Sequence, residues 1–194
     1  MRKVLLLTLL TTVTVSVSAK KKYAITMTGE NLSTLTQVTD NAEPCLDPFG
    51  GDNGNALFFS VRENKRYYNI YKKDNPFSAA MSQKTSGKNY NRNPCYNPET
   101  GKIAFSCMQD GSSTSDIFTM FDSKGKALSQ ITESTDAYEE NPSFNKLGTL
   151  IVYNKIQLSF YRKANWATFF FGFGGSTVVV ENSEIWLRNV KTGE

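Results

Sequence analysis

The side chains of this chain that most readily form covalent bonds are the thiols of three cysteines, Cys45, Cys95 and Cys107. Cys95 and Cys107 fall on the two arms of one expected hairpin, where they could face each other and form a disulfide within the Cα separation that a bridge tolerates. The alternative is that all three are small buried hydrophobic side chains. Their spacings match no zinc-binding pattern.

Histidine is absent from the sequence, and this restricts the chemistry that the chain can perform. Neither a Ser-His-Asp triad nor a Cys-His pair can be assembled without it. The sequence also contains no G-x-S-x-G motif and no glycine-rich phosphate-binding loop. We therefore expect no catalytic residues, no cofactor and no peptidase or esterase activity.

Two polar segments, 47–55 and 109–116, contain enough side-chain oxygen atoms for weak calcium binding. Neither follows the ligand order of an EF-hand, and Asp, Asn, Gly and Ser are ordinary loop residues. We expect both segments to be loops without a metal site. The acidic pair Glu139 and Glu140 is expected to be solvated.

An internal repeat of about 50 residues positions these candidates. Its first landmark is a proline, at Pro44, Pro94 and Pro142, spaced by 50 and 48 residues. Segment 93–106 aligns without gaps on 141–154, whereas the earlier copy has four extra residues in its turn before Phe59 matches Phe105. Two further landmarks follow in order, first at Tyr68–Lys73, Ser115–Met120 and Ser183–Arg188, and then at 35–39, 81–85 and 128–132.

One repeat encodes four short strands, as the copy from Cys95 to Thr132 illustrates. A short strand at 95–97 is followed by a turn at 98–101, by an alternating strand through Ile103, Phe105 and Cys107, and by strands at 116–121 and 127–132. Four antiparallel strands in just under fifty residues are typical of a β-propeller blade. A blade packs against a neighbour on each face, so several blades are expected.

The repeat resembles that of the TolB-like family, a WD40-like family with a P-x-W-S-P-D-G turn, an I-A-F strand, D-I-Y and a terminal L-T. Here the segment reads PCYNPETGKIAF, then DIF, then LSQIT. Tyr96 stands where the family has Trp, and residues 99–101 replace Asp-Gly. The resemblance covers residues 23–194 and implies an all-β fold, with blades of four antiparallel strands in an incomplete ring of about three blades.

The N-terminus has the layout of a secretory signal peptide. Arg2 and Lys3 precede an apolar, Thr-rich run from Val4 to Val17, and the small residues Ser18 and Ala19 follow. A membrane anchor is the alternative, but the run is too short and too rich in Thr to span a bilayer comfortably. We expect cleavage after Ala19, an exported protein, and no transmembrane segment in the mature chain.

The expected organisation is a signal peptide at 1–19 followed by a partial propeller at 20–194. The propeller divides into the outer strands of an opening half-blade at 20–43, blades at 44–91 and 92–139, and a blade at 140–194 with an insertion near 155–182. The insertion contains a group of aromatic residues: Trp166, Phe169, Phe170, Phe171 and Phe173. These side chains either contact a partner from a protruding hairpin or fold against their own blade.

The resemblance implies a non-enzymatic, exported scaffold for protein interactions in the periplasm or at the outer membrane. TolB-family propellers are associated with outer-membrane maintenance and bind a peptidoglycan-associated lipoprotein, so the implied partner is another protein of the cell envelope. The alternative is the N-terminal propeller of a prolyl-oligopeptidase-type serine peptidase without its catalytic domain. The net charge of +4 and the scattered Lys and Arg residues give no sign of nucleic-acid binding.

Overall fold

A computed structural model describes residues 38–39, 43–123, 128–162 and 176–193 of this 194-residue chain. Blade one consists of β1 (Cys45–Gly51), the 3-10 turn η1 (Asp52–Gly54), β2 (Ala56–Glu63), β3 (Tyr67–Lys73) and β4 (Ser82–Gln83). Blade two consists of β5 (Tyr90–Asn97), β6 (Lys102–Met108), β7 (Asp116–Phe121) and β8 (Ser129–Gln130). Blade three consists of β9 (Ala137–Phe144), β10 (Leu150–Arg162) and β11 (Ser176–Asn189).

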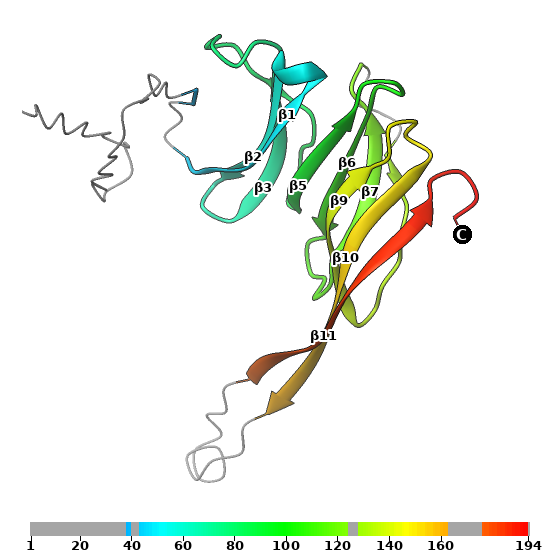
Figure 1. The fold of residues 1–194 in the computed structure, drawn as a ribbon. Coiled ribbons are helices and arrows are strands. Elements are labelled where there is room, and N and C mark those ends of the chain that lie inside the picture. The colour runs from blue at the N-terminus through cyan, green and yellow to red at the C-terminus, as the bar shows by residue number, and fades with distance from the viewer. Residues whose placement is uncertain (1–37, 40–42, 124–127, 163–175, 194) are drawn as a thin grey trace, which may run out of the picture.

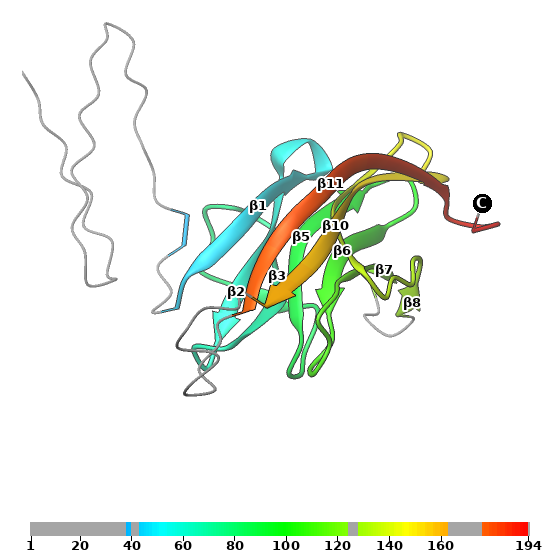
Figure 2. The ribbon, with the colours of Figure 1, turned by 90° about the horizontal axis from the view of Figure 1, so that it is seen from below.

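Each blade is an antiparallel meander in which strands that follow one another along the chain pair with one another. A parallel bridge between Tyr68 and Tyr90 joins blades one and two, and another between Ser115 and Tyr138 joins blades two and three. The blades stand side by side in Figure 1, and the order from β5 to β8 can be followed in Figure 2. The described strands form an open arc, which confirms the all-β class and the incomplete ring of propeller blades.

The strands of blade two differ in length from the sequence prediction at two places. The prediction of β7 at 116–121 is confirmed, and β6 covers the alternating segment. In contrast, β5 begins at Tyr90 and continues through Pro94, because a bulge takes up the residue that cannot donate a backbone hydrogen bond. The last strand is only two residues long, Ser129–Gln130.

The apolar cores lie between the blades. The first cluster joins Ala56, Phe58 and Ile70 of blade one to Ile103, Phe105, Cys107, Phe118 and Met120 of blade two. The second cluster joins Cys95, Ala104 and Ile117 of blade two to Ile151 and Tyr153 of blade three. Full burial of one side chain of this size contributes about 1.5–3 kcal/mol, so packing between blades is a main source of stability.

The predicted equivalence of Phe59, Phe105 and Tyr153 is confirmed. Each lies on the second strand of its blade, and their exposed fractions are 2%, 1% and 3%. Phe105 belongs to the core between blades one and two, and Tyr153 to the core between blades two and three. These two side chains therefore face the preceding blade.

A half-buried cluster of charges also joins blades one and two. Asp122 accepts a contact from Lys72 at 2.5 Å and from Lys84 at 2.6 Å, and each of the three side chains is at most 15% exposed. The ammonium group of Lys72 also lies 5.4 Å from the centre of the Phe58 ring. The Phe58 ring stacks on the ring of Tyr96, and the two ring centroids are 4.8 Å apart. Charge pairing and aromatic packing therefore meet at one interface.

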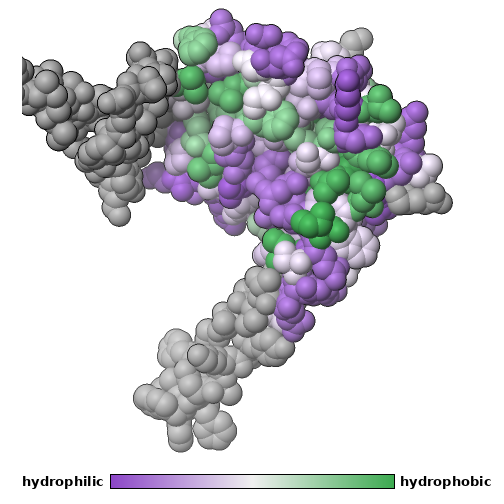
Figure 3. Space-filling view, viewed as in Figure 1, coloured by the Kyte–Doolittle hydropathy of each residue, from purple (hydrophilic) through white to green (hydrophobic). Residues whose placement is uncertain are grey.

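Blade three exposes apolar side chains on the face that is directed away from blade two. In blade two the equivalent face is covered, because it packs against blade three. Ile185 is 70% exposed, Leu187 59% and Val152 39%. The space-filling view shows apolar residues over β10 and β11 (Figure 3). Within the described ranges, no helix is long and apolar enough to cross a membrane.

Candidate binding site on the inner strands

The first strand of every blade carries the same two-residue irregularity. The pairing of β1 with β2, of β5 with β6 and of β9 with β10 shifts register at an Asx-Pro pair, namely Asp47–Pro48, Asn93–Pro94 and Asn141–Pro142. Asp47, Asn93 and Asn141 adopt φ values of +53°, +53° and +54°. Asn and Asp are the side-chain-bearing residues that best tolerate this left-handed conformation, which explains the residue type at all three positions.

This geometry corrects the sequence alignment of the first repeat. Pro48, and not Pro44, is the equivalent of Pro94 and Pro142. With Pro48 as the landmark, Phe59 lies eleven positions after the proline, as Phe105 does after Pro94 and Tyr153 after Pro142. The four extra turn residues expected in the first copy are therefore absent, and the signal that identifies the right proline is the Asx residue before it.

The three Asx side chains connect one blade to the next. The Asn93 side-chain amide donates a hydrogen bond to Asn141 Oδ1 at 2.5 Å, and the Asn93 backbone N–H donates to Asp47 Oδ2 at 3.3 Å. Asp47, Asn93 and Asn141 therefore form a ladder across β1, β5 and β9. These are the first strands of the three blades, and we call them the inner strands. A ladder of this kind holds the inner strands at a fixed spacing and presents polar groups along one wall.

Asp47 is the charged member of the ladder, and several donors hold it in place. Arg92 binds both carboxylate oxygens of Asp47 at 2.8 Å, and the Ser60 hydroxyl donates to Oδ2 at 3.0 Å. Burial alone would raise the pKa of Asp47, but the donors from Arg92, Asn93 and Ser60 outweigh it and lower the pKa. Asp47 is therefore an anion whose oxygens are occupied by protein donors.

The expectation that the whole of segment 47–55 is a loop is wrong. Residues 47–51 belong to β1, and only 52–55 form the turn. Among the described residues, no group of three or more His, Cys, Asp or Glu side chains is arranged to hold a metal ion. In segment 109–116, the Ser112 hydroxyl donates to the backbone carbonyl of Thr114 at 3.0 Å.

Two adjoining hollows follow the inner strands. The first has a volume of about 200 Å³ and is lined by the three Asx-Pro pairs together with Phe49 and Cys95. The second has a volume of about 440 Å³ and is lined by Phe49, Asn53, residues 95–99 and residues 143–146. Phe49 and Cys95 belong to both linings, so the two hollows adjoin. We call this surface the inner wall.

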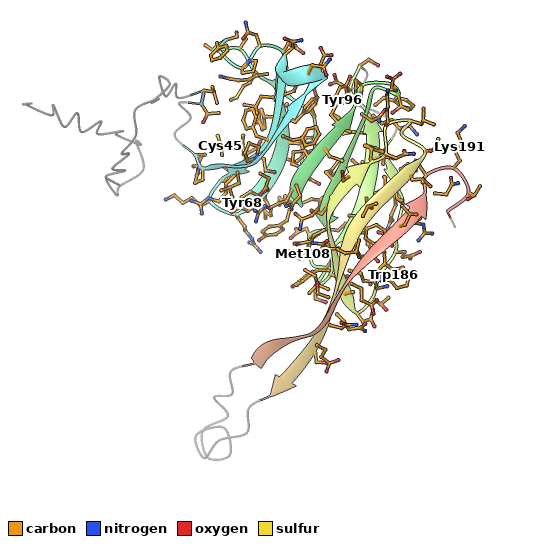
Figure 4. The ribbon with its side chains drawn as sticks, viewed as in Figure 1. Cys45, Tyr68, Tyr96, Met108, Trp186 and Lys191 are labelled. Atoms are coloured by element: carbon orange, nitrogen blue, oxygen red, sulfur yellow. The ribbon has the colours of Figure 1, made fainter. Side chains whose placement is uncertain are left out.

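Backbone turns hold the second hollow in shape. The Asn97 side-chain amide donates to the carbonyl oxygens of Asn145 and Lys146, both at 3.0 Å, and so joins the turn of blade two to that of blade three. Asn97 Oδ1 also accepts from the backbone N–H of Thr100 at 2.9 Å. In Figure 4, Tyr96 marks this end of the blades and Tyr68 the opposite end.

The cysteines do not face each other as the sequence analysis allowed. Cys95 pairs with Ala104 and Cys107 pairs with Asn91, because the bulge shifts the register between them. Cys95 belongs to the second core cluster and Cys107 to the first, so their side chains lie on opposite faces of the blade. Among the described residues no cysteine forms a disulfide, and burial raises the pKa values of Cys95 and Cys107 to about 12.

The acidic pair is also less solvated than expected. Glu139 is 2% exposed and lies 3.6 Å from Lys155, the residue opposite it on β10. Its other carboxylate oxygen, Oε2, is buried without a hydrogen-bond partner among the described residues. Burial also raises the pKa of the neighbouring Glu140, although the charge of Arg92 partly offsets this rise. The pair therefore belongs to the packing of blade three.

The predicted aromatic contact residues Trp166, Phe169, Phe170, Phe171 and Phe173 lie outside the described residues. The strands that lead to them are described. β10 and β11 remain paired from Leu158 with Val180 to Arg162 with Ser176, whereas the pairing of β10 with β9 ends at Gln157. These paired arms project from the body of the molecule in Figure 1.

Comparisons with known proteins support the fold. No family model and no curated protein matches the chain. A structure assigned as TolB from Agrobacterium tumefaciens matches with a TM-score of 0.54 and 17% identity, over 78% of this chain and 52% of that chain. TolB from Acinetobacter baumannii matches with a TM-score of 0.53 and 16% identity, over 81% of this chain and 44% of that chain.

These likenesses identify the fold class. The chain has the fold of a TolB-like β-propeller and spans about half the length of the two TolB structures. A prolyl endopeptidase structure also matches, with a TM-score of 0.42 and 14% identity, and a likeness of that size carries no functional argument.

Proposed function

We propose that this chain is a non-enzymatic scaffold that is exported and binds another protein of the cell envelope through the inner wall. The observation that carries the proposal is the wall itself, where two adjoining hollows are lined by Asx-Pro pairs and apolar side chains. Such a surface combines polar groups that orient a ligand with apolar groups that bury it. The absence of histidine from the sequence supports a binding role over a hydrolytic one.

The proposed envelope location has a sequence basis of its own. The basic residues, apolar run and small residues at 1–19 have the layout of a secretory signal. N-terminal sequencing of the protein recovered from a periplasmic fraction is expected to begin at Lys20. A mature protein that retains Met1 would contradict export by this route.

Site-specific photo-crosslinking tests the inner wall as the contact surface. A photoreactive amino acid at Ser143, an exposed residue in the lining of the second hollow, is expected to capture an envelope protein in intact cells. The matched control carries the same amino acid at Gln130, an exposed residue of the outer strand β8. Equal adducts at the two positions, or none at Ser143, would contradict the proposal.

A further inference from the structure

A row of tyrosine rings between two guanidinium groups crosses the junction of blades one and two. The ring of Tyr90 lies 6.3 Å from that of Tyr67 and 6.0 Å from that of Tyr68, centre to centre. The guanidinium carbon of Arg66 lies 5.5 Å from the centre of the Tyr67 ring. That of Arg92 lies 5.2 Å from the centre of the Tyr68 ring. We call these five side chains the Arg-Tyr row, and Tyr68 marks it in Figure 4.

Backbone pairing and an ion pair hold the Arg-Tyr row in place. The parallel bridge that joins the two blades lies between Tyr68 and Tyr90, so it brings residues of β3 and β5 together. Arg92 is fixed at one end of the row because its guanidinium group binds both carboxylate oxygens of Asp47 at 2.8 Å. The row is therefore organised without a ligand, and a preorganised site loses less conformational entropy when a ligand binds.

The junction of blades two and three shows that the fold does not require this row. The bridge there joins Ser115 to Tyr138, so a serine stands at the place of Tyr68. The residue before the Asx-Pro pair is Glu140 in blade three and Arg92 in blade two, which reverses the charge at that place. The bridge between blades therefore forms with neither a second ring nor a cation at these two places, and the row needs another explanation.

The row also adjoins cations without a counter-ion. Lys65 and Arg66 lie in the turn between β2 and β3, Lys88 lies shortly before β5, and all three side chains are exposed. Among the described residues, none of the three forms an ion pair. The carboxylate of Glu63, at the start of the same turn, accepts hydrogen bonds from three other side chains. Lys65 stands at a φ of +60°, a conformation that favours glycine.

We propose that the Arg-Tyr row and the adjoining lysines bind an acidic peptide segment of a partner protein. A guanidinium group that lies over a ring keeps its N–H edge available for two parallel hydrogen bonds to a carboxylate. Tyr and Arg are also among the residue types that contribute most binding energy at protein interfaces. The proposal does not depend on binding at the inner wall, because the lining of the two hollows contains none of these residues.

Two observations favour the carboxylates of a peptide over the phosphates of a nucleic acid. Single strands bind by stacking their bases on open aromatic faces. Here a guanidinium group covers one face of Tyr67 and of Tyr68, and Tyr90 contacts both of these rings. The net charge of the chain is only +4, so the cations form a compact group and not the extended basic track that a nucleic acid requires.

Fluorescence anisotropy with the full chain tests the proposal. The probe is a fluorescein-labelled peptide, GDEDEDEG, and the matched control peptide is GNQNQNQG, which has the same length and shape without the charges. Saturable binding of the acidic peptide is expected at physiological ionic strength. The amide peptide is expected to bind at least about tenfold more weakly, the effect of losing a hydrogen bond to a charged group.

Two substitutions at Arg66 separate the row from general charge attraction. Arg66→Gln is expected to weaken binding of the acidic peptide at least about threefold, the effect of one exposed ion pair. Arg66→Lys, which keeps the charge but not the planar fork, is expected to show a smaller loss. The matched control is Lys102→Gln, because Lys102 also lies over an aromatic ring, that of Phe121 at 5.3 Å, but at the other end of blade two. This control is expected to bind like the parent.

Four results would overturn the proposal. The first is the absence of saturable binding at peptide concentrations up to about 1 mM, the range of weak complexes. The second is equal binding of the acidic and amide peptides, a comparison made on the unchanged chain that stands even if a variant unfolds. The third is an equal loss in Arg66→Gln and Lys102→Gln. The fourth is tighter binding of an oligothymidylate of equal charge that Arg66→Gln abolishes, because the row would then be a phosphate site.

Discussion

Blades two and three have the same strand register but different surroundings. Ala104 and Ile117 of blade two are fully buried, whereas the equivalent residues of blade three, Val152 and Ile185, are 39% and 70% exposed. The difference arises because blade three covers one face of blade two and no described residue covers the same face of blade three in this way. Burial in this fold is therefore a property of the interface between blades.

Substitutions on the face toward the preceding blade are expected to have the largest effect on the free energy of unfolding. The effect should be similar in blades two and three. Phe105→Ala in blade two and Tyr153→Ala in blade three each remove a buried ring, so each is expected to cost about 3–5 kcal/mol of the free energy of unfolding. Urea denaturation monitored by circular dichroism measures both. A loss below about 1 kcal/mol for either variant would remove that residue from the core.

Substitutions on the face toward the following blade should affect stability differently in blades two and three. Ile117→Ala is expected to cost about 2–5 kcal/mol because Ile117 packs in the second core cluster. Ile185→Ala, the matched variant, is expected to change stability by no more than about 0.5 kcal/mol because the side chain is 70% exposed. Equal losses in chemical denaturation would show that the face of blade three is covered in solution.

The hydrogen bond that holds the fourth strand of blade two is expected to contribute less to the free energy of unfolding. Thr132→Val keeps the shape of the side chain but leaves the N–H of Ile117 without its acceptor in a buried place. An unsatisfied buried donor costs about 1–3 kcal/mol. Thr85→Val is the matched variant in blade one, where the surroundings are only partly buried. Hydrogen exchange at the Ile117 amide should accelerate in Thr132→Val, and unchanged exchange would contradict this role.

The charge cluster between blades one and two gives the smallest effect, with a defined pH dependence. Burial would raise the pKa of Asp122, but hydrogen bonds from Lys72 and Lys84 outweigh it and lower the pKa below its usual value of 3.8. The ionised carboxylate therefore stabilises the fold above that value, and the contribution is lost as the pH falls below it.

Asp122→Asn is expected to cost about 1 kcal/mol at neutral pH, the range of partly exposed ion pairs. The difference in melting temperature between wild type and variant should shrink as the pH falls below about 3.8. Asp116 and Glu140, whose pKa values are raised by burial, are present in both proteins and cancel in this difference. A difference that grows on acidification would contradict the assignment.

Local patterns predicted the strands well and the details of pairing poorly. Alternation through Ile103, Phe105 and Cys107 predicted β6 because every second side chain of a strand points to the same face. The same pattern could not show that a bulge at Asn93–Pro94 shifts the register and separates Cys95 from Cys107. A one-residue shift reverses the faces of the following residues, and a sequence pattern does not fix where that shift occurs.

The candidate site was predicted only in part. The prolines were noticed, but the choice of Pro44 in the first repeat hid the ladder of Asp47, Asn93 and Asn141. Residues about 48 positions apart in the chain meet there, as the hydrogen bond between Asn93 and Asn141 shows. Their positive φ values identify the equivalence, and a backbone angle is not visible in the residue types alone.

The sequence by itself determined the repeat, the order of the strands and the propeller class, because these depend on local alternation, turn residues and spacing that each repeat carries within itself. Only the tertiary structure decided which faces are buried, how Asp47 and Glu139 are paired, and which strand edge is open. The physical reason is that burial and charge pairing depend on the neighbouring blade. Ile117 and Ile185 occupy equivalent positions in their blades, and yet the first is buried and the second is exposed.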